Sequence, residues 1–204
     1  ILDDGSNPSF QPKYNNVNTY LYTSKINYGL GITTNISINF MLENNYDFLV
    51  RIDGDNQHPI DYIPQLVEKL IYGSDFCIGT RINANTGKGF RQILSNFVKS
   101  YFNFMAKVFI SNKIPNDLSS GFMAFNKKAA LFLSNNKLER YPEPEIIMLL
   151  ASKNFNISEI EIKQLPRLKG DSTISYFRGF LLIYKFNIFI FNHFLNKVLQ
   201  KCKP

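Results

Sequence analysis

The chain has 204 residues, of which 45% are hydrophobic, which is enough for one domain with its own core and argues against a disordered segment. Its net charge of +7 is compatible with an anionic membrane surface or a phosphorylated substrate, but the basic residues are scattered and form no aromatic and basic platform, so no nucleic acid partner is expected. Cys77 and Cys202 lie far apart, which excludes a disulfide framework or a zinc pattern and favours a reducing, cytosolic setting.

Short apolar runs alternate with helical patterns along the chain, and turn residues separate them. In chain order the predicted elements are strand 1–6, strand 17–24, helix 33–43, strand 46–52, helix 61–72, strand 74–80, helix 91–110, strand 121–126, helix 127–134, a helix opened by residues 141–145, and strand 157–165. This alternation predicts βαβ units in an α/β fold, with a mostly parallel sheet flanked by helices. Thr33 or Thr34 is the expected N-cap of the first helix. Asp61 is the expected N-cap of the second, with Pro64 in its first turn.

Two carboxylates spaced i, i+2 follow the predicted strand 46–52: Asp53 and Asp55, with a glycine between them. Strands put residues i and i+2 on the same side, so both side chains can converge at the exit of the strand. Two such oxygen ligands suit a hard cation such as Mg²⁺ or Mn²⁺, with the remaining positions left for water and phosphates. An EF-hand loop is excluded, because its sixth and twelfth positions would be His58 and Pro64.

Polar residues also stand at the ends of two other predicted strands. They are the pair Asp3 and Asp4 where the first strand ends and runs into a turn, and Arg81 after the strand 74–80. In open α/β sheets, ligands bind outside the carboxyl ends of the strands. These residues and the Asp53–Asp55 pair are therefore expected to form one site.

Six motifs stand in a characteristic order. They are Asp3-Asp4-Gly5-Ser6, Asp53-Gly54-Asp55-Asn56-Gln57-His58-Pro59, Gly79-Thr80-Arg81, Asp117-Leu118-Ser119-Ser120-Gly121-Phe122, Tyr141-Pro142-Glu143-Pro144-Glu145 and Arg167-Leu168-Lys169-Gly170-Asp171-Ser172. Each is weak alone, but together the set resembles the family 2 glycosyltransferases of the GT-A fold. The similarity is strongest to the group around dolichyl-phosphate mannosyltransferase and related bacterial sugar transferases, and it covers nearly the whole chain.

The resemblance implies that a hexose is transferred, with inversion, from a UDP- or GDP-sugar to a polyprenyl phosphate or a glycan. Asp3 and Asp4 match the nucleotide-sugar-binding segment, in which the acid at the position of Asp4 helps hold the nucleoside. Asp53 and Asp55 match the acids that hold a divalent cation, Mg²⁺ or Mn²⁺, against the donor diphosphate. Gln57 matches a further ligand of the cation.

Three arginines are candidates for binding the donor phosphates: Arg81, Arg91 and Arg167. Arginine presents a planar fork of donors that suits phosphate oxygens. The resemblance adds that Arg167 matches a loop arginine that approaches the phosphates.

The catalytic set implied by the resemblance is Asp55, Arg167 and an acid near the acceptor. A sugar hydroxyl needs a general base, whereas a polyprenyl phosphate is already anionic and needs none. Glu145 stands at about the position where inverting relatives place a catalytic acid residue, and Asp117 is the alternative. Both could instead be structural.

Structural alternatives exist for most of these residues. The Asp53–Asp55 segment could be a turn with solvated acids, with His58 only supporting it. Arg81 could pair with a carboxylate, and Asp3 could bond backbone amides at the exit of its strand. Glu143 and Glu145 could complement a helix dipole. Cys77 is expected to be a core residue.

The expected domain organisation is a GT-A domain over residues 1–172 and a hydrophobic, amphipathic helical segment over 173–204. The family has a further strand and helix before the Asp3–Ser6 segment, so the chain is expected to be N-terminally truncated. Met123 stands where relatives often have arginine. Charged and amide residues interrupt the stretch 177–199, which favours an interfacial helix or a helix packed on the sheet over a spanning one.

The expected location is cytoplasmic, at the inner face of the membrane, where the positive charge would meet an anionic leaflet. Two other functions stay open. A sugar-phosphate nucleotidyltransferase would need a glycine-rich basic loop near the N-terminus to bind a triphosphate, and no such loop is visible in the sequence. A catalytically silent nucleotide-sugar-binding module would bind a donor without turnover.

Overall fold

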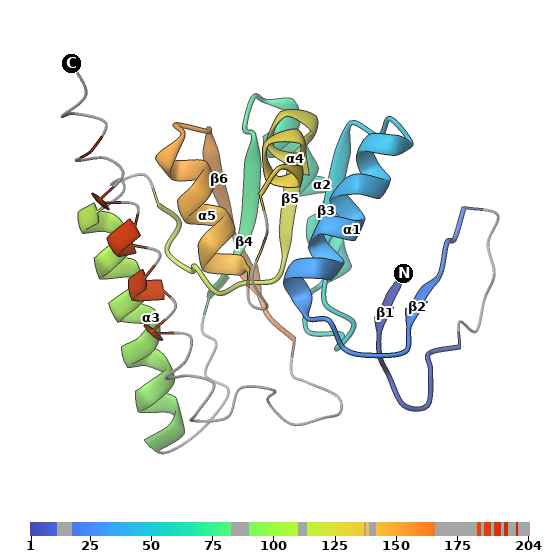
Figure 1. Cartoon of the computed structure of the whole chain (residues 1–204), viewed down its shortest axis with the longest axis horizontal. Helices are drawn as coiled ribbons and strands as arrows, with labels where there is room; N and C mark the ends of the chain where they lie inside the picture. The colour runs from blue at the N-terminus through green and yellow to red at the C-terminus, as the bar shows by residue number, and fades with distance from the viewer. Residues whose placement is uncertain are drawn as a thin grey trace.

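A computed structural model describes residues 1–11, 18–82, 90–109, 114–136, 138, 142–165 and parts of 183–199 (Figure 1). Its elements, in chain order, are β1 (Leu2–Asp4), β2 (Tyr22–Ser24), α1 (Leu30–Glu43), β3 (Phe48–Arg51), the 3₁₀ turn η1 (Ile60–Tyr62), α2 (Ile63–Ile71), β4 (Phe76–Ile82), α3 (Phe90–Phe109), β5 (Met123–Asn126), α4 (Lys127–Ser134), α5 (Glu143–Ser152) and β6 (Ile157–Lys163). Each predicted strand and helix has its counterpart here, so the α/β class is confirmed.

The main sheet has the strand order β3-β5-β4-β6. β6 pairs with β4 in parallel, while β5 pairs antiparallel with β3 on one side and β4 on the other. Hence β3, β4 and β6 run in one direction, as expected for a mostly parallel sheet, and β5 runs against them. The sequence did not predict this reversal. The turn before β5 is held at the carboxyl end of β4, where Asp117 pairs with Arg81, so the chain enters β5 from that end of the sheet.

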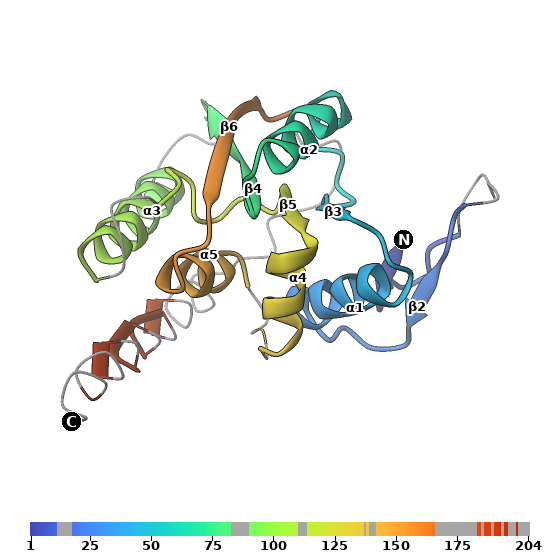
Figure 2. The same cartoon turned by 90° about the horizontal axis from the view of Figure 1, so that it is seen from above.

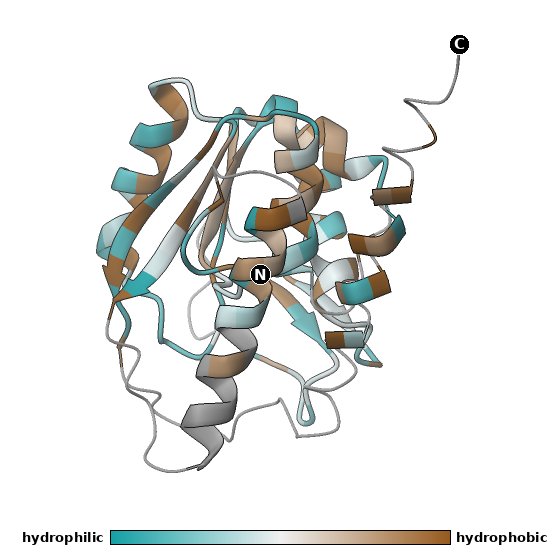
Figure 3. Cartoon of the chain, turned by 90° about the vertical axis from the view of Figure 1, so that its left-hand side faces the viewer, coloured by the Kyte–Doolittle hydropathy of each residue, from teal (hydrophilic) through white to brown (hydrophobic). Residues whose placement is uncertain are grey.

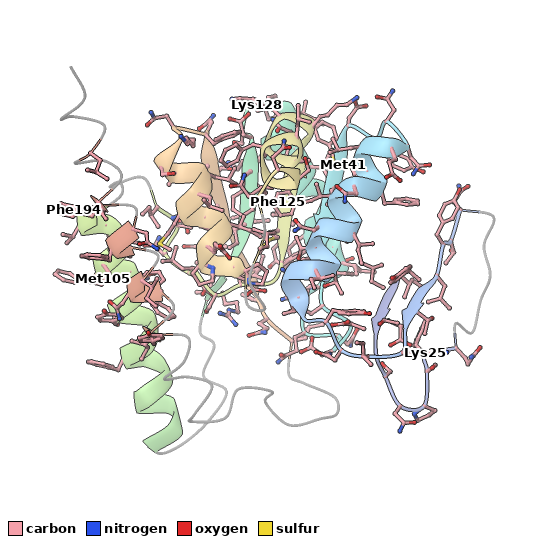
Figure 4. All side chains as sticks on the ribbon, viewed as in Figure 1. Lys25, Met41, Met105, Phe125, Lys128 and Phe194 are labelled. Carbon is pink, nitrogen blue, oxygen red and sulfur yellow. The ribbon has the colours of Figure 1, made fainter. Side chains whose placement is uncertain are left out.

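Apolar residues fill both faces of this sheet because successive strand residues point to opposite sides. Phe76 and Ile78 of β4 join the larger core beneath α1, α4 and α5, whereas Cys77 joins a smaller core beneath α2. Figure 2 shows these helices on the two faces. Figure 4 places Met41 and Phe125 in the larger core, where both are buried. Cys77 is fully buried, which confirms it as a core residue, and this burial raises the pKa of its thiol.

β1 and β2 form a separate two-stranded parallel sheet. Among the described strands, none pairs with the second edge of β1 or of β3. A cavity of about 1000 Å³ lies between them, lined by Ile1, Leu2 and Tyr22 on one side and by the successive residues 49–55 on the other. Since successive residues alternate between the two faces of a strand, a cavity that touches each of them borders the edge of β3.

α3 lies beyond β6 and packs against the described pieces of the C-terminal segment (Figure 1). The rings of Phe102 and Phe186 are 4.3 Å apart, and Phe186 and Ile190 are buried. Where residues 183–199 are described they are helical, and Figure 3 shows both apolar and polar residues on these pieces. No helix in the described part of the chain is long and apolar enough to cross a membrane.

Two predicted helix caps are wrong. The N-cap of α1 is Gly29, and the Thr33 and Thr34 hydroxyls lie inside the helix, where both donate to Leu30 O. A hydroxyl that can bond the preceding turn of its own helix does not mark a helix start. Asp61 lies in η1, and α2 has no side-chain cap. Pro64 is in the first turn of α2, as predicted.

Candidate functional site

The acidic loop begins directly after β3 and turns tightly. Asn56 has a φ of 62°, a left-handed conformation that asparagine tolerates better than most residues. The Gln57 N–H donates to Asp55 Oδ1 at 3.1 Å, which closes the turn. Asp53 and Asp55 are both half-buried at the carboxyl end of the strand, so the expectation for their placement is confirmed.

Arg51 connects this loop to the start of α5. Its Nη2 lies 2.7 Å from Glu143 Oε1 and 3.5 Å from Asp53 Oδ1, and only 9% of its side chain is exposed. Its Nη1 is buried and has no hydrogen-bond partner among the described residues. The contact between Arg51 and Glu143 was not predicted; the only signal in the sequence is that Arg51 stands two residues before the first acid of the motif.

His58 supports the loop from beneath. It is buried, stacks on Phe122 with 5.2 Å between ring centroids, and accepts a hydrogen bond at Nδ1 from Asp53 N–H at 3.1 Å. Burial lowers the pKa of the imidazole below its usual value of 6.5, although the charges of Asp53 and Asp55 oppose this. His58 is therefore a neutral acceptor at Nδ1, in agreement with its predicted supporting role.

This depressed pKa predicts how stability depends on pH. The unfolded imidazole takes up a proton near pH 6.5, whereas folded His58 does so only at lower pH, so the unfolded state binds more protons in that window. The free energy of unfolding of the metal-free protein should fall as the pH drops below about 6.5. His58→Phe keeps a ring against Phe122 but cannot titrate, so its urea-unfolding midpoint should change less between pH 7 and pH 5. A His58→Phe curve parallel to that of the wild type would assign the dependence to other groups.

Gln57 fixes the far end of the loop to the segment after β6. Its backbone oxygen accepts from Leu165 N–H at 3.0 Å, and its Nε2 lies 3.5 Å from Leu165 O. The side chain is buried. Gln57 thus has a clear structural part, and its place as a ligand of a cation stays a prediction.

Arg81, at the end of β4, forms the closest ion pair of the described structure with Asp117. Its Nε and Nη2 lie 2.5 and 2.9 Å from the two carboxylate oxygens, and Nη2 also donates to Ser119 Oγ at 2.6 Å. Burial acts to lower the pKa of Arg81, but the bonds and charge of Asp117 raise it above its ordinary value. This geometry supports the structural alternative for both residues; their parts in donor binding and catalysis stay predictions.

A second polar group anchors the same turn to β6. The Glu159 carboxylate accepts from Thr80 Oγ1 at 2.6 Å and from the backbone N–H and side-chain amide of Asn116 at 2.9 and 2.7 Å. Sequence reasoning missed these contacts, because they join residues on β4, on β6 and in the turn before β5.

Asp3 and Asp4 are both engaged by backbone amides. Asp3 accepts from the N–H groups of Ser6 and Phe10, and a hydrogen bond from the Ser6 side chain is the main cause of its lowered pKa. Asp3 thus bonds backbone amides, as expected, and its place in nucleotide-sugar binding stays a prediction. Asp4 accepts at 2.8 Å from the N–H groups of Tyr28 and Gly29, just before α1. Asp4 shares the large cavity with Asp53 and Asp55, and its contact with a nucleoside stays a prediction.

The structure says little about three other candidate residues of the site, Arg167, Arg91 and Glu145. Arg167 and its loop lie outside the described residues, and so does the side chain of Arg91. Glu145 is half-buried in the first turn of α5, where Glu143 rather than Glu145 contacts Arg51. The catalytic parts assigned to Glu145 and Arg167 stay predictions.

The charged groups of β3, β4 and α5 act on one another. The charges of Asp53 and Glu143 raise the pKa of Arg81. The positive charges of Arg81 and Arg51 lower the pKa of His58. The carboxylates of this group (Asp53, Asp55, Asp117 and Glu143) outnumber its two guanidinium groups by two. A divalent cation would balance that excess.

The donor set also fits a hard cation. Within the described residues no group of three or more His, Cys, Asp or Glu side chains could hold a metal ion. Asp53 and Asp55 supply two carboxylates, and Mg²⁺ is commonly bound by one or two carboxylates together with substrate phosphates and water. The arrangement is therefore suited to a cation that arrives with a diphosphate, and not to a closed site made of protein ligands alone.

Comparison with protein families identifies the family of the chain. Residues 1–132, about two thirds of the chain, match the model of the family described as Glycosyl transferase family 2. A search of curated proteins gave no match. The matched region contains the acidic loop, Arg81 and the turn that leads into β5.

Proposed function

Because the chain belongs to glycosyl transferase family 2, we propose that it transfers a hexose from a UDP- or GDP-sugar to a polyprenyl phosphate or a glycan, with inversion at the anomeric carbon and with Mg²⁺ or Mn²⁺. Membership of the family shows that the chain is a glycosyltransferase, which uses a nucleotide-sugar donor and an acceptor. The identity of the donor, the acceptor and the cation belongs to the proposal.

One observation carries the proposal furthest: the pair of carboxylates at the carboxyl end of β3. Asp53 and Asp55 follow the end of β3 and are separated by one residue. Arg51 contacts the carboxylate of Asp53, and His58 accepts a hydrogen bond from its backbone N–H. This is the edge of an α/β sheet at which ligands bind. Two half-buried carboxylates in a group with excess negative charge suit a cation bound to a diphosphate.

When bound, the cation would stabilise the negative charge that develops on the leaving nucleoside diphosphate. Asp53 and Asp55 would hold it, with Gln57 as a further ligand. Arg167 would contribute a planar fork of donors to the phosphates. The acceptor would approach from the side of α5, where Glu145 is the proposed base for a hydroxyl and Asp117 the alternative.

A polyprenyl phosphate acceptor would require contact with a membrane. Large apolar side chains on α3 and on the C-terminal pieces are exposed, among them Phe104, Tyr184 and Phe191. Lys107, in the last turn of α3, is also exposed. Exposed apolar rings beside a lysine suit the interface of an anionic bilayer. These observations support the proposal that the protein acts at the cytoplasmic face of a membrane, with the 173–204 segment in contact with it.

The test is a screen of the full chain against UDP-, GDP- and dTDP-sugars, with Mn²⁺ and with polyprenyl phosphate in anionic vesicles. Mass spectrometry should detect a glycosylated polyprenyl phosphate that disappears when EDTA is added. Co-sedimentation of the chain with the vesicles should be weaker for uncharged vesicles. Neutral glycan acceptors in the same screen separate the two acceptor classes.

Other outcomes would favour the rival functions. Release of pyrophosphate from a nucleoside triphosphate and a sugar phosphate would indicate a nucleotidyltransferase. Metal-dependent binding of a nucleotide sugar without transfer or hydrolysis would indicate a silent binding module. Neither outcome is expected, because the family match and the acidic loop both favour transfer.

A further inference from the structure

The register between β3 and β5 places Gly121 opposite Asp53. Arg51 pairs with Met123, and the same antiparallel register, continued by two residues beyond each strand, brings Asp53 and Gly121 face to face. Directly opposed residues have Cβ positions about 4.5–5.5 Å apart, close enough for their side chains to interact. Asp53 reaches across this gap: a Cβ at position 121 would lie 2.9 Å from its Oδ1 and Cγ, and closer still to its Oδ2.

An added methyl group at this position could not be absorbed by a small rotation. Rotation about the Cβ–Cγ bond of Asp53 moves the oxygens but leaves Cγ in place, and Cγ itself is too close. The carboxylate would have to change its χ1 rotamer and leave its present place. A side chain at position 121 would thus move the Asp53 carboxylate without changing its charge.

The backbone of Gly121 cannot easily retreat instead. The next residue, Phe122, is fully buried, stacks on His58 and accepts from Gly79 N–H at 2.8 Å. Four residues before Gly121, Asp117 is held by its ion pair with Arg81. Both neighbours of the contact are therefore fixed to the sheet, and the movable group is the Asp53 carboxylate.

We propose that Gly121 is a positioning residue: its missing side chain admits the Asp53 carboxylate to the place from which it binds the divalent cation of the donor site. This inference rests on the proposed function for the identity of the ligand. Arg51 Nη2, 3.5 Å from Asp53 Oδ1, also touches the carboxylate, so Gly121 and Arg51 together fix its orientation.

The first test compares Gly121→Ala with Asp61→Ala. Asp61 is exposed and is not among the residues that line the cavity, so this control changes a residue close to the acidic loop but outside the site. Binding of GDP and UDP in the presence of Mn²⁺ is followed by calorimetry, and free Mn²⁺ by electron paramagnetic resonance. Gly121→Ala should weaken the Mn²⁺-dependent binding by roughly tenfold or more, and Asp61→Ala by less than about twofold. Equal affinities of Gly121→Ala and the wild type would overturn the proposal.

The second test measures the contact itself through thermal unfolding. Gly121→Ala should lower the Tm of the wild type by roughly 2–10 °C, and that of Asp53→Ala by much less, because the clashing carboxylate is then gone. An equal loss in both backgrounds would assign the effect to the backbone and overturn the proposal. If the wild type binds no Mn²⁺–nucleotide at all, the proposed function fails, and this cycle still decides whether Gly121 positions the carboxylate.

Discussion

Replacement of Asp55 by alanine should reduce sugar transfer by roughly 10²–10³-fold and abolish the Mn²⁺-dependent binding of UDP or GDP. Asp55 supplies one of two carboxylates in the candidate cation site, and no His, Cys, Asp or Glu cluster of the described residues could replace it. Its loss leaves a single carboxylate, which holds a divalent cation poorly. Calorimetry with Mn²⁺ and each nucleotide, beside a transfer assay, measures both effects.

Asp61→Ala is the matched control for this experiment. Asp61 is exposed in η1, six residues from Asp55, so its loss removes the same charge from nearly the same part of the chain. Affinity and transfer should stay within about twofold of the wild type. Because Asp55 also accepts the Gln57 N–H, Asp55→Asn is a second variant that keeps an acceptor for the turn. Unchanged Mn²⁺-dependent affinity in both Asp55 variants would remove the assignment of the site.

Replacement of Arg81 by methionine should cost about 3–5 kcal/mol of the free energy of unfolding, because it leaves the buried carboxylate of Asp117 without its cation. The two side chains are 16% and 7% exposed, and the pair holds the turn that leads into β5. Urea unfolding measures the loss. Lys128→Met removes an exposed cation from Asp75, whose buried carboxylate keeps the hydrogen bonds from the Asn126 side chain and the Asn156 N–H, so this variant should lose less stability than Arg81→Met.

The double variant Arg81→Met, Asp117→Leu separates the charge effect from packing. Replacing both members of a buried pair by apolar residues is often nearly neutral, so most of the lost stability should return. If the single variant were as stable as the wild type, the ion pair would not hold the turn. A double variant that is stable but no longer binds Mn²⁺–nucleotide would support a further part for Arg81 or Asp117 in the donor site.

Local patterns were sufficient to predict the elements and the acidic loop. The apolar stripe at i, i+3, i+4 spacing predicted the helix observed as α2, and the end of the predicted strand placed both acids after β3, where they are observed. These signals depend on neighbours in sequence and on the periods of helix and strand. The predicted threonine caps failed because a hydroxyl in a helix can also bond the preceding turn.

The contacts that shape the site could not be predicted in the same way. Arg51 and Glu143 are separated by 92 positions, and Arg81 and Asp117 by 36. Such pairs depend on which strands lie next to one another and in which direction, and the reversed direction of β5 has no local signal in the sequence. The opposition of Asp53 and Gly121 follows only once the register of β3 and β5 is known.

The order β3-β5-β4 has a consequence for folding. β5 is made after α3, yet it separates two strands that precede it in the chain, so neither β3 nor β4 can complete its pairing until β5 has inserted between them. Closing these distant contacts is slow compared with forming local ones. A nascent chain or fragment that ends before residue 121 would carry both acids of the loop without the strand that braces them. The acidic loop therefore gains the support of Gly121 and Phe122 only when β5 has paired with β3.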